Sequence, residues 1–459
     1  MLAARIPGCA LEVRLESPRW RLGAWVAAFL ISFLGRILLI HETPAVYSWD
    51  AFTRLWDPNT IAVNYWLPLP QMPIYLLSRL GLDVPFIRIA YAAVAAGAAT
   101  VLGLAIARLT NHAVGLLAGL LTSLSPIFLV FSVVPYQEGF ALLFIATVLL
   151  ALARRPAEDA RGSWWLPAIA LAGGALCRYE VWMFCVVLGI GFVARRQAWN
   201  LKMLLPAALA AASWLATDNL RPDADPYRST FSTLTAGEVL VRGLRAIPTV
   251  SEQLAKDVCW VGIPFALFGA VVCFRRKNIL GRELLAFWLA TVLLAIARNV
   301  KWGSLTERMT VIPSSLTATL AAVGLGVIVG RIPARWHLRY LTSVGIAMAM
   351  LFAARGYRTA AGLSTMFAPE AEASRILLDL ARNEIPAPGV MVRGRPGPEN
   401  YIKAIFGQSI WLDPKDPRWL WRSDAVSTPN PRLRVALVFD ARVRRYRLTR
   451  PGIDQEVAR

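Results

Sequence analysis

Long apolar runs separated by short polar connectors dominate the first 355 residues of the chain. Each run is about 15 to 22 residues long, close to the length that an α-helix needs to cross a bilayer core of ~30 Å. A helix satisfies its backbone hydrogen bonds internally, as the membrane interior requires. The pattern therefore predicts about eleven membrane-spanning helices, near residues 22–40, 86–107, 113–131, 139–153, 164–177, 181–194, 203–217, 258–274, 283–297, 310–330 and 338–353.

The apolar stretch 164–194 fits either one tilted helix or two short helices, because Arg178, Tyr179 and Glu180 interrupt it. A single helix would move Arg195 and Arg196 to the side of the membrane opposite the other basic connectors. Two helices of about 14 residues, each ~21 Å long, keep all the basic connectors together. We therefore expect two helices joined by a turn below the membrane surface, where irregular backbone is tolerated only beside a protein cavity.

The last hundred or so residues differ in composition from the rest. Apolar residues recur at helical spacing in "PEAEASRILLDLARNEI", and "ENYIKAIFG" also resembles a helix, whereas "GVMVR", "SIWL" and "LRVALVFD" resemble short strands. We therefore predict two domains: a helical membrane domain over residues 1–355, including an outer loop at 41–85, and a small soluble α/β domain over 356–459.

Composition and charge support a polytopic membrane protein. Of the 459 residues, 56% are hydrophobic and only 17% are charged, against about 25% charged in soluble domains. The net charge of +20 comes from short basic clusters between apolar runs, a pattern that marks cytoplasmic connectors and not a nucleic-acid-binding surface. We therefore expect a multi-pass protein of the inner or plasma membrane, with a cytoplasmic N-terminus, the C-terminal domain outside and no nucleic-acid partner.

Cysteine and histidine give no sign of a structural zinc site. The five cysteines lack CxxC spacing and lie mostly in apolar runs, and the three histidines are far apart in the sequence. Free cysteines in such runs behave as small hydrophobic residues.

The first polar cluster follows the first apolar run, in "YSWDAFTRLWD". On a helix, Asp50, Arg54 and Asp57 would share one face, and the tryptophans beside them are equally compatible with a solvated interfacial helix. The sequel "NYWLPLPQMPIYLL" contains three prolines and predicts a bent, structured segment. Its Trp66 and Gln71 are further candidate substrate-binding residues.

Three more polar clusters fall at predicted helix ends on the same side of the membrane. Glu138 lies in the short turn "PYQEG", where headgroup water could simply hydrate it, and Arg178 and Glu180 could form a structural pair. The segment "RNVKWGSLTERMTVIP" places Arg298, Lys301 and Arg308 on the side where few bases are expected, which suggests a phosphate ligand. Ionisable groups gathered at one face favour chemistry on a lipid-linked substrate over transport, which more naturally uses mid-bilayer groups.

These features resemble the GT-C superfamily of membrane glycosyltransferases, particularly the group related to protein O-mannosyltransferases and lipid A aminoarabinose transferases. The resemblance lies in "SWDAFTRL" after the first span, "WLPLPQMPIYLL", the acidic turn "PYQEG", "RYEVW" and an outer C-terminal domain. It implies transfer of a hexosyl or pentosyl group, with inversion, from a polyprenyl-phosphate donor to a lipid, glycan or protein acceptor in the cell envelope.

The resemblance also implies roles for individual residues. Asp50 corresponds to the general base, and Glu138 would assist it or help to hold a divalent cation such as Mg²⁺ or Mn²⁺. The candidates for binding the phosphate or the rest of the substrate are Arg54, Asp57, Trp66, Gln71, Arg178, Glu180, Arg298, Lys301 and Arg308, together with Arg36 near the end of the first span.

Two departures limit the resemblance. The Asp-Glu pair of the protein mannosyltransferases is Asp50-Ala51 here, and the "WWD" signature of oligosaccharyltransferases is absent. Neither the acceptor nor metal dependence therefore follows from it. The alternatives are a transporter or flippase for a lipid-linked or anionic solute, and a non-catalytic assembly or export subunit.

Overall fold

The computed structural model describes residues 17–43, 51, 54, 67–82, 84–153, 164–219, 235–275, 279–302, 307–383, 389–393, 433–440 and 445–449. The chain divides into two compact units. The first comprises the described parts of Met1–Leu39, Asn64–Pro70 and Ile89–Thr359, and the second those of Ile40–Val63, Gln71–Arg88 and Ala360–Arg459.

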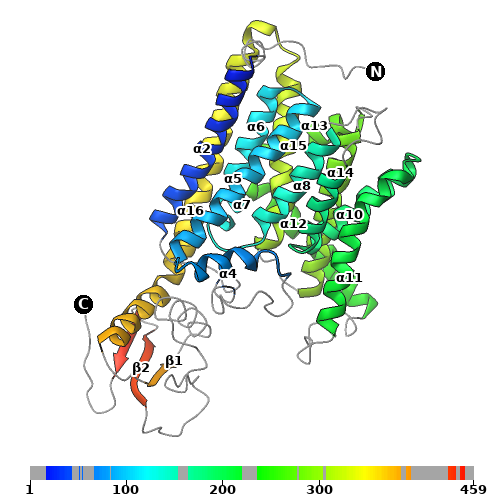
Figure 1. Cartoon of the computed structure of the whole chain (residues 1–459). Coiled ribbons are helices and arrows are strands. Elements are labelled where there is room, and N and C mark those ends of the chain that lie inside the picture. The colour runs from blue at the N-terminus through cyan, green and yellow to red at the C-terminus, as the bar shows by residue number, and fades with distance from the viewer. Residues whose placement is uncertain are drawn as a thin grey trace. The chain divides into compact units, whose positions relative to one another are not determined.

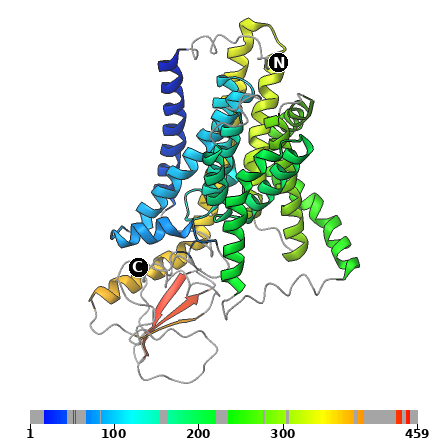
Figure 2. The ribbon, with the colours of Figure 1, turned by 45° about the vertical axis from the view of Figure 1, so that its right-hand side comes forward.

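The first unit is a helical bundle (Figures 1 and 2). Three of its helices, α2, α5 and α16, continue across the division between the units. Its elements are α2 (Pro18–Glu42), α5 (Val84–Leu109), α6 (His112–Leu124), α7 (Pro126–Phe131), α8 (Glu138–Ala153), α9 (Trp165–Ala175), α10 (Tyr179–Ala194), the 3-10 helix η1 (Ala198–Leu204), α11 (Leu205–Asn219), α12 (Ala236–Asp257), α13 (Gly262–Arg275), α14 (Ile279–Trp302), the 3-10 helix η3 (Glu307–Thr310), α15 (Val311–Val329) and α16 (Ala334–Asn383).

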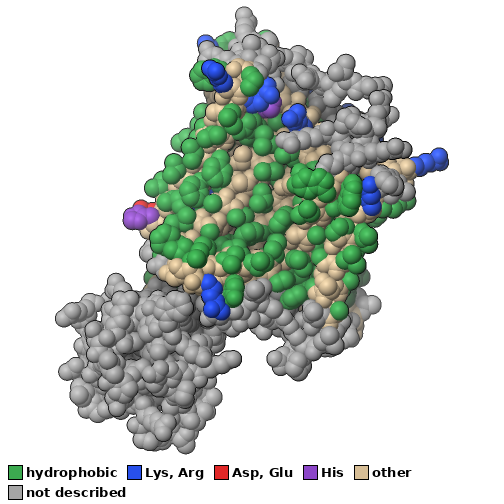
Figure 3. Space-filling view, viewed as in Figure 1, with side chains coloured by type: hydrophobic (Ala, Val, Ile, Leu, Met, Phe, Trp, Pro, Cys, Tyr) green, Lys and Arg blue, Asp and Glu red, His purple; other side chains and the backbone are tan. Residues whose placement is uncertain are grey.

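A helix occupies each of the eleven predicted spans, but the count of eleven crossings is not confirmed. Within the described ranges, four helical segments are long and apolar enough to cross a membrane: Pro18–Glu42, Val84–Leu109, Leu280–Lys301 and Arg308–Val329. A fifth arises if the pair Gly237–Asp257 and Gly262–Arg275, bent by 104°, counts as one span. Hydrophobic side chains cover the middle of the bundle face in Figure 3, where the described charged side chains lie towards its edges, as a lipid-facing surface requires.

The stretch 164–194 forms two helices, α9 and α10, as predicted from charge. Leu176, Cys177 and Arg178 separate them, and the N–H of Arg178 still donates to the carbonyl of Gly174 at 3.1 Å. The break therefore places Arg178 at the N-cap of α10 with extended backbone.

Glycine residues allow α13 and α15 to pack closely against each other. A Cβ atom at Gly324 of α15 would collide with the carbonyl oxygen of Phe265 in α13, and one at Gly269 of α13 would collide with that of Leu320 in α15. Small residues of this kind let the backbones of membrane helices approach each other closely. α15 is buried along nearly its whole length, so it forms the centre of the bundle.

The second unit includes α4 (Gln71–Arg79), the last part of α16 and a three-stranded sheet in the order β1-β2-β3. The strands are β1 (Gly389–Arg393), β2 (Leu433–Asp440) and β3 (Arg445–Thr449). β1 pairs with β2 in parallel, with Met391 opposite Ala436, and β2 pairs with β3 in antiparallel orientation, with Val438 opposite Arg447.

Two of the predicted strands, "GVMVR" and "LRVALVFD", are confirmed, whereas "SIWL" and the helix "ENYIKAIFG" lie outside the described residues. The sequence did not reveal β3. The helix predicted around residues 369–385 is the end of α16, which runs without a break through residue 355. The separate α/β domain over 356–459 stays a prediction.

Candidate active site

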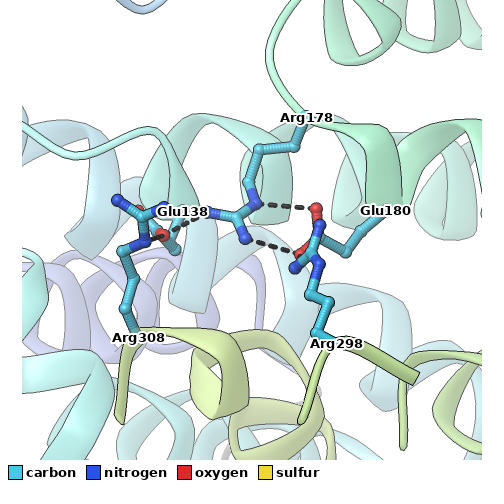
Figure 4. Close-up of polar contacts among 5 residues, drawn as sticks. All are labelled: Glu138, Arg178, Glu180, Arg298 and Arg308. Atoms are coloured by element: carbon cyan, nitrogen blue, oxygen red, sulfur yellow. Dashed lines mark hydrogen bonds and ion pairs between the residues drawn. The ribbon is translucent and has the colours of Figure 1, made fainter. Parts of the chain in front are cut away.

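Arg178 lies at the centre of a buried ionic cluster. Its fork-shaped guanidinium donates from Nε to Glu180 Oε2 at 2.8 Å, from Nη2 to Glu180 Oε1 at 2.5 Å and from Nη1 to Glu138 Oε1. Figure 4 shows its guanidinium lying between the two carboxylates. Its side chain is 4% exposed and that of Glu138 is 1% exposed. The predicted Arg178–Glu180 pair therefore exists, and Glu138 joins it from another helix.

Two further arginines complete the cluster. Arg298 Nη1 pairs with Glu180 Oε1, and Arg308 Nε lies 4.0 Å from Glu138 Oε1. Their side chains are 20% and 23% exposed, so they are more accessible than Arg178. Among the described side chains of the cluster, three guanidinium groups face two carboxylates.

The cluster forms because four helix ends meet. α8 begins at Glu138, α10 begins directly after Arg178, α14 ends a turn after Arg298, and η3 with Arg308 leads into α15. The sequence predicted that these ends share one side of the membrane, and the structure brings Glu138, Arg178, Glu180, Arg298 and Arg308 into contact (Figure 4).

The turn before Glu138 is packed and not solvated. Every residue from Ser132 to Gln137 is buried. The ring of Tyr136 meets Phe131 edge-on at 5.3 Å, and the guanidinium of Arg308 lies 5.3 Å from the centre of the Tyr136 ring. Glu138 is therefore not a carboxylate hydrated by headgroup water, because ion pairs replace the solvent around it.

The proline-rich segment after the first loop lies beside this cluster. The N–H of Leu69 donates to the carbonyl of Leu176, two residues before Arg178, at 3.1 Å. The hydroxyl of Tyr91 in α5 donates to the carbonyl of Pro70. The bent segment predicted from its prolines thus packs against the break between α9 and α10.

Arg36 occupies a separate polar cluster inside the bundle. Its Nε donates to Ser132 Oγ at 2.7 Å, its Nη1 to Ser123 Oγ at 2.7 Å, and its Nη2 to the carbonyl of Ser123 at 2.9 Å. Because α6 ends at Leu124, that carbonyl belongs to the negative end of the helix dipole. The fully buried guanidinium of Arg36 therefore caps α6, although the sequence suggested a phosphate ligand.

The other candidates lie elsewhere or outside the described residues. In the second unit, Gln71 is buried and its Nε2 donates to the carbonyl of Arg54, also buried, at 2.7 Å. Lys301 is half-buried in the last turn of α14, one turn after Arg298. Asp50, Asp57 and Trp66 lie outside the described residues, so their roles stay predictions.

The sequence did not single out two residues that bear on the site. Tyr136 contacts Arg308, and Asp257 at the end of α12 accepts hydrogen bonds from the start of α15. In the sequence, Asp257 differs from its neighbours only in being an isolated carboxylate directly before the apolar run at 258–274. No group of three or more His, Cys, Asp and Glu side chains that could hold a metal ion occurs in the described parts of the chain.

Comparison with known proteins identifies the fold. No protein-family model matches the sequence, and no curated protein does. Among solved structures, ArnT from Cupriavidus metallidurans bound to undecaprenyl phosphate has a TM-score of 0.61 at 12% identity, covering 90% of this chain and 93% of ArnT. An oligosaccharyltransferase from Archaeoglobus fulgidus, in complex with zinc and sulfate, has a TM-score of 0.52 at 14% identity, covering 82% of this chain and 61% of that one.

Both neighbours are GT-C glycosyltransferases, and ArnT is an aminoarabinose transferase. The resemblance to the GT-C superfamily is therefore confirmed at the level of fold. At these identities the likeness concerns the arrangement of helices and leaves the activity to be argued from the site.

Proposed function

We propose that this chain is an integral-membrane glycosyltransferase of the GT-C type. It transfers a hexosyl or pentosyl group from a polyprenyl-phosphate donor to an acceptor at the outer face of the membrane. The observation that carries the proposal is the buried cluster of Glu138, Arg178, Glu180, Arg298 and Arg308, which lies at one end of a GT-C-like bundle and whose described side chains are three arginines and two glutamates. Arginine side chains suit a phosphate group.

The proposed reaction is a single inverting displacement. An acceptor hydroxyl oxygen attacks the anomeric carbon, and the bond from that carbon to the phosphate oxygen breaks. The electron pair of that bond leaves with the polyprenyl phosphate. The hydroxyl proton passes to the carboxylate of Asp50, which acts as the general base. Inversion and the role of Asp50 rest on the sequence resemblance.

Arginine charge supplies what the leaving group requires. Polyprenyl phosphate gains negative charge as the bond breaks, and preorganised cations stabilise such charge most strongly where water is excluded. Arg298 and Arg308 are the more accessible arginines and would contact the phosphate, whereas Arg178 is enclosed by both carboxylates and would hold them in place. Among the neighbours, ArnT binds undecaprenyl phosphate, which agrees with this assignment.

The acceptor and the topology belong to the same proposal. A lipid, glycan or protein hydroxyl fits the chemistry equally, and an acceptor peptide is bound in one structure of the archaeal neighbour. The basic connectors support a proposed topology with the N-terminus in the cytoplasm and the cluster on the outer side. Arginines pair with both oxygens of Glu180 and with Oε1 of Glu138, and the proposal assigns no step to a divalent cation.

A reconstituted transfer assay tests the proposal. Purified protein in liposomes receives polyprenyl-phospho-sugars labelled in the sugar, with membrane extract as the source of acceptors. We expect labelled sugar on an acceptor together with one released polyprenyl phosphate for each transfer. Movement of intact donor across the bilayer without transfer would instead identify a flippase and contradict the proposal.

Asp50→Asn is the sharpest variant for this assay. The amide cannot accept the proton of the acceptor hydroxyl, so we expect transfer to fall by about 100-fold or more while the protein remains folded in the membrane. Near-normal transfer by Asp50→Asn would remove Asp50 from the mechanism.

A further inference from the structure

Asp257 is a buried carboxylate that the proposed chemistry does not use. It is 3% exposed and is the last residue of α12. A negative charge at a helix C-terminus opposes the helix dipole and is locally unfavourable. The dipole of α12 therefore does not favour this carboxylate, and hydrogen bonds, two of them from another element, stabilise it.

Both oxygens of Asp257 accept hydrogen bonds. Oδ2 accepts from Thr310 Oγ1 at 2.9 Å and from Ser314 Oγ at 2.6 Å, and Oδ1 accepts from Gln253 Nε2 at 2.8 Å. Thr310 and Ser314 are fully buried. The carboxylate thus joins the end of α12 to the start of α15, where its charge is favourable to the dipole of α15.

The hydroxyl of Thr310 bonds this carboxylate and does not cap its own helix. Thr310 is the N-cap residue of α15, and an N-cap hydroxyl normally accepts from the backbone N–H of the second or third helical residue. The third residue here is Pro313, which has no N–H. The hydroxyl makes no capping bond and donates to Asp257 instead.

Thr310 also ends η3, which carries Arg308 two residues earlier. Arg308 lies over Tyr136 and beside Glu138. A displacement of Thr310 would therefore move the Arg308 guanidinium away from the ionic cluster. The corner after Asp257 is fixed as well, because Cys259 and Trp260 adopt positive φ values of 53° and 59°, a conformation that persists only where the surrounding structure enforces it.

We propose that Asp257 is a positioning residue that holds η3 so that Arg308 meets the phosphate of the donor. Asp257 touches no substrate and acts through Thr310. The consequence for transfer rests on the proposed function, whereas the effect on η3 does not.

The primary test compares Thr310→Val with Thr310→Ser. Valine keeps the shape of threonine without its hydroxyl, and serine keeps the hydroxyl. We expect Thr310→Val to speed hydrogen–deuterium exchange of peptides covering residues 307–314 and to lower the transfer rate constant kcat about tenfold. Thr310→Ser should restore both. The control is Thr317→Val, which removes another buried, hydrogen-bonded hydroxyl from α15 at a site bonded to Trp288, and it should leave kcat unchanged.

A double-mutant cycle decides whether the effect passes through Arg308. Combined with Arg308→Gln, Thr310→Val should add almost no further loss of transfer, because residues acting through one group are not additive. The same cycle can be repeated with Asp257→Asn in place of Thr310→Val. The proposal would be overturned if Thr310→Val left the hydrogen–deuterium exchange of residues 307–314 unchanged. It would also be overturned if the losses of transfer in the two single variants multiplied in the double variant. A wild-type protein without transfer would refute the proposed function, while the exchange result would still decide the positioning of η3.

Discussion

Arg178 shows how one side chain can organise a buried site. Burying charge is costly, and a buried ion pair is tolerated only when its geometry satisfies most of the donors and acceptors. Arg178 meets this condition because its planar fork pairs with both oxygens of Glu180 and with one of Glu138. Lysine offers a single point charge and could not span the same three contacts.

Removing this arginine should destabilise the protein strongly. Arg178→Gln leaves the carboxylates of Glu138 and Glu180 buried with one cation fewer. We expect the free energy of unfolding to fall by about 3–5 kcal/mol, measured by denaturant titration in detergent micelles. The matched control is Lys256→Gln, which breaks the solvent-exposed Lys256–Glu252 pair and should cost at most about 1 kcal/mol. Equal effects of the two variants would show that the cluster contributes nothing beyond a surface pair.

The sequence predicted the residue types at this site better than their partners. Glu138, Arg178, Glu180, Arg298 and Arg308 stood out because ionisable groups interrupt or end apolar runs. Which carboxylate meets which arginine depends on the packing of α8, α10, α14 and η3, and no local pattern encodes that. Arg36 shows the same limit, since its acceptors on Ser123 and Ser132 lie about 90 positions away in the sequence.

At the level of elements, ion pairs tie α10 to α14 near both ends. Glu180 in the first turn of α10 pairs with Arg298, and Arg195 at the C-cap of α10 pairs with Glu283 at 2.6 Å. The charges of α10 follow its dipole, with the acid at its N-terminus and the base at its C-terminus. Gly191 leaves the space that the Glu283 carboxylate fills. This double connection keeps the Glu180–Arg298 contact in register.

The close packing of α13 against α15 should be disrupted by a single added methyl group. Gly324→Ala would push the two backbones apart, and we expect it to lower the free energy of unfolding by about 1–3 kcal/mol. The control is Gly97→Ala in α5, where a Cβ atom would have no neighbour within 4 Å, so the better helix propensity of alanine should leave stability equal or higher. Denaturant titration of both variants tests this, and a neutral Gly324→Ala would contradict the close approach.

Helix positions were more predictable than helix lengths and crossings. The long apolar runs located a helix in every predicted span, and charge distinguished α9 from α10. It could not predict that α6 and α7 are broken at Ser125, that α12 and α13 meet at 104°, or that α16 extends from Ala334 to Asn383. Each of these depends on tertiary neighbours that hydropathy does not report.

At the scale of the whole molecule, the fold and the charge distribution support one account. α8, α10 and α15 begin at the ionic cluster and α14 ends there, so Arg195 and Arg196, which follow α10, lie at the opposite end of that helix from the cluster. The GT-C-like bundle and the arginines gathered at one of its ends are the two observations on which the proposed transfer from a lipid-linked sugar rests. The proposed function requires that the two more accessible arginines of the cluster, Arg298 and Arg308, act on the substrate.

The most direct test is the transfer rate of Arg308→Gln with a labelled polyprenyl-phospho-sugar. Loss of one preorganised cation at the leaving phosphate should lower the rate about 100-fold or more, while the exposed control Arg339→Gln should match the wild type. Protein that remains folded, as judged by unchanged denaturant titration, makes the comparison valid. An Arg308→Gln variant that transfers sugar at the wild-type rate would contradict the account.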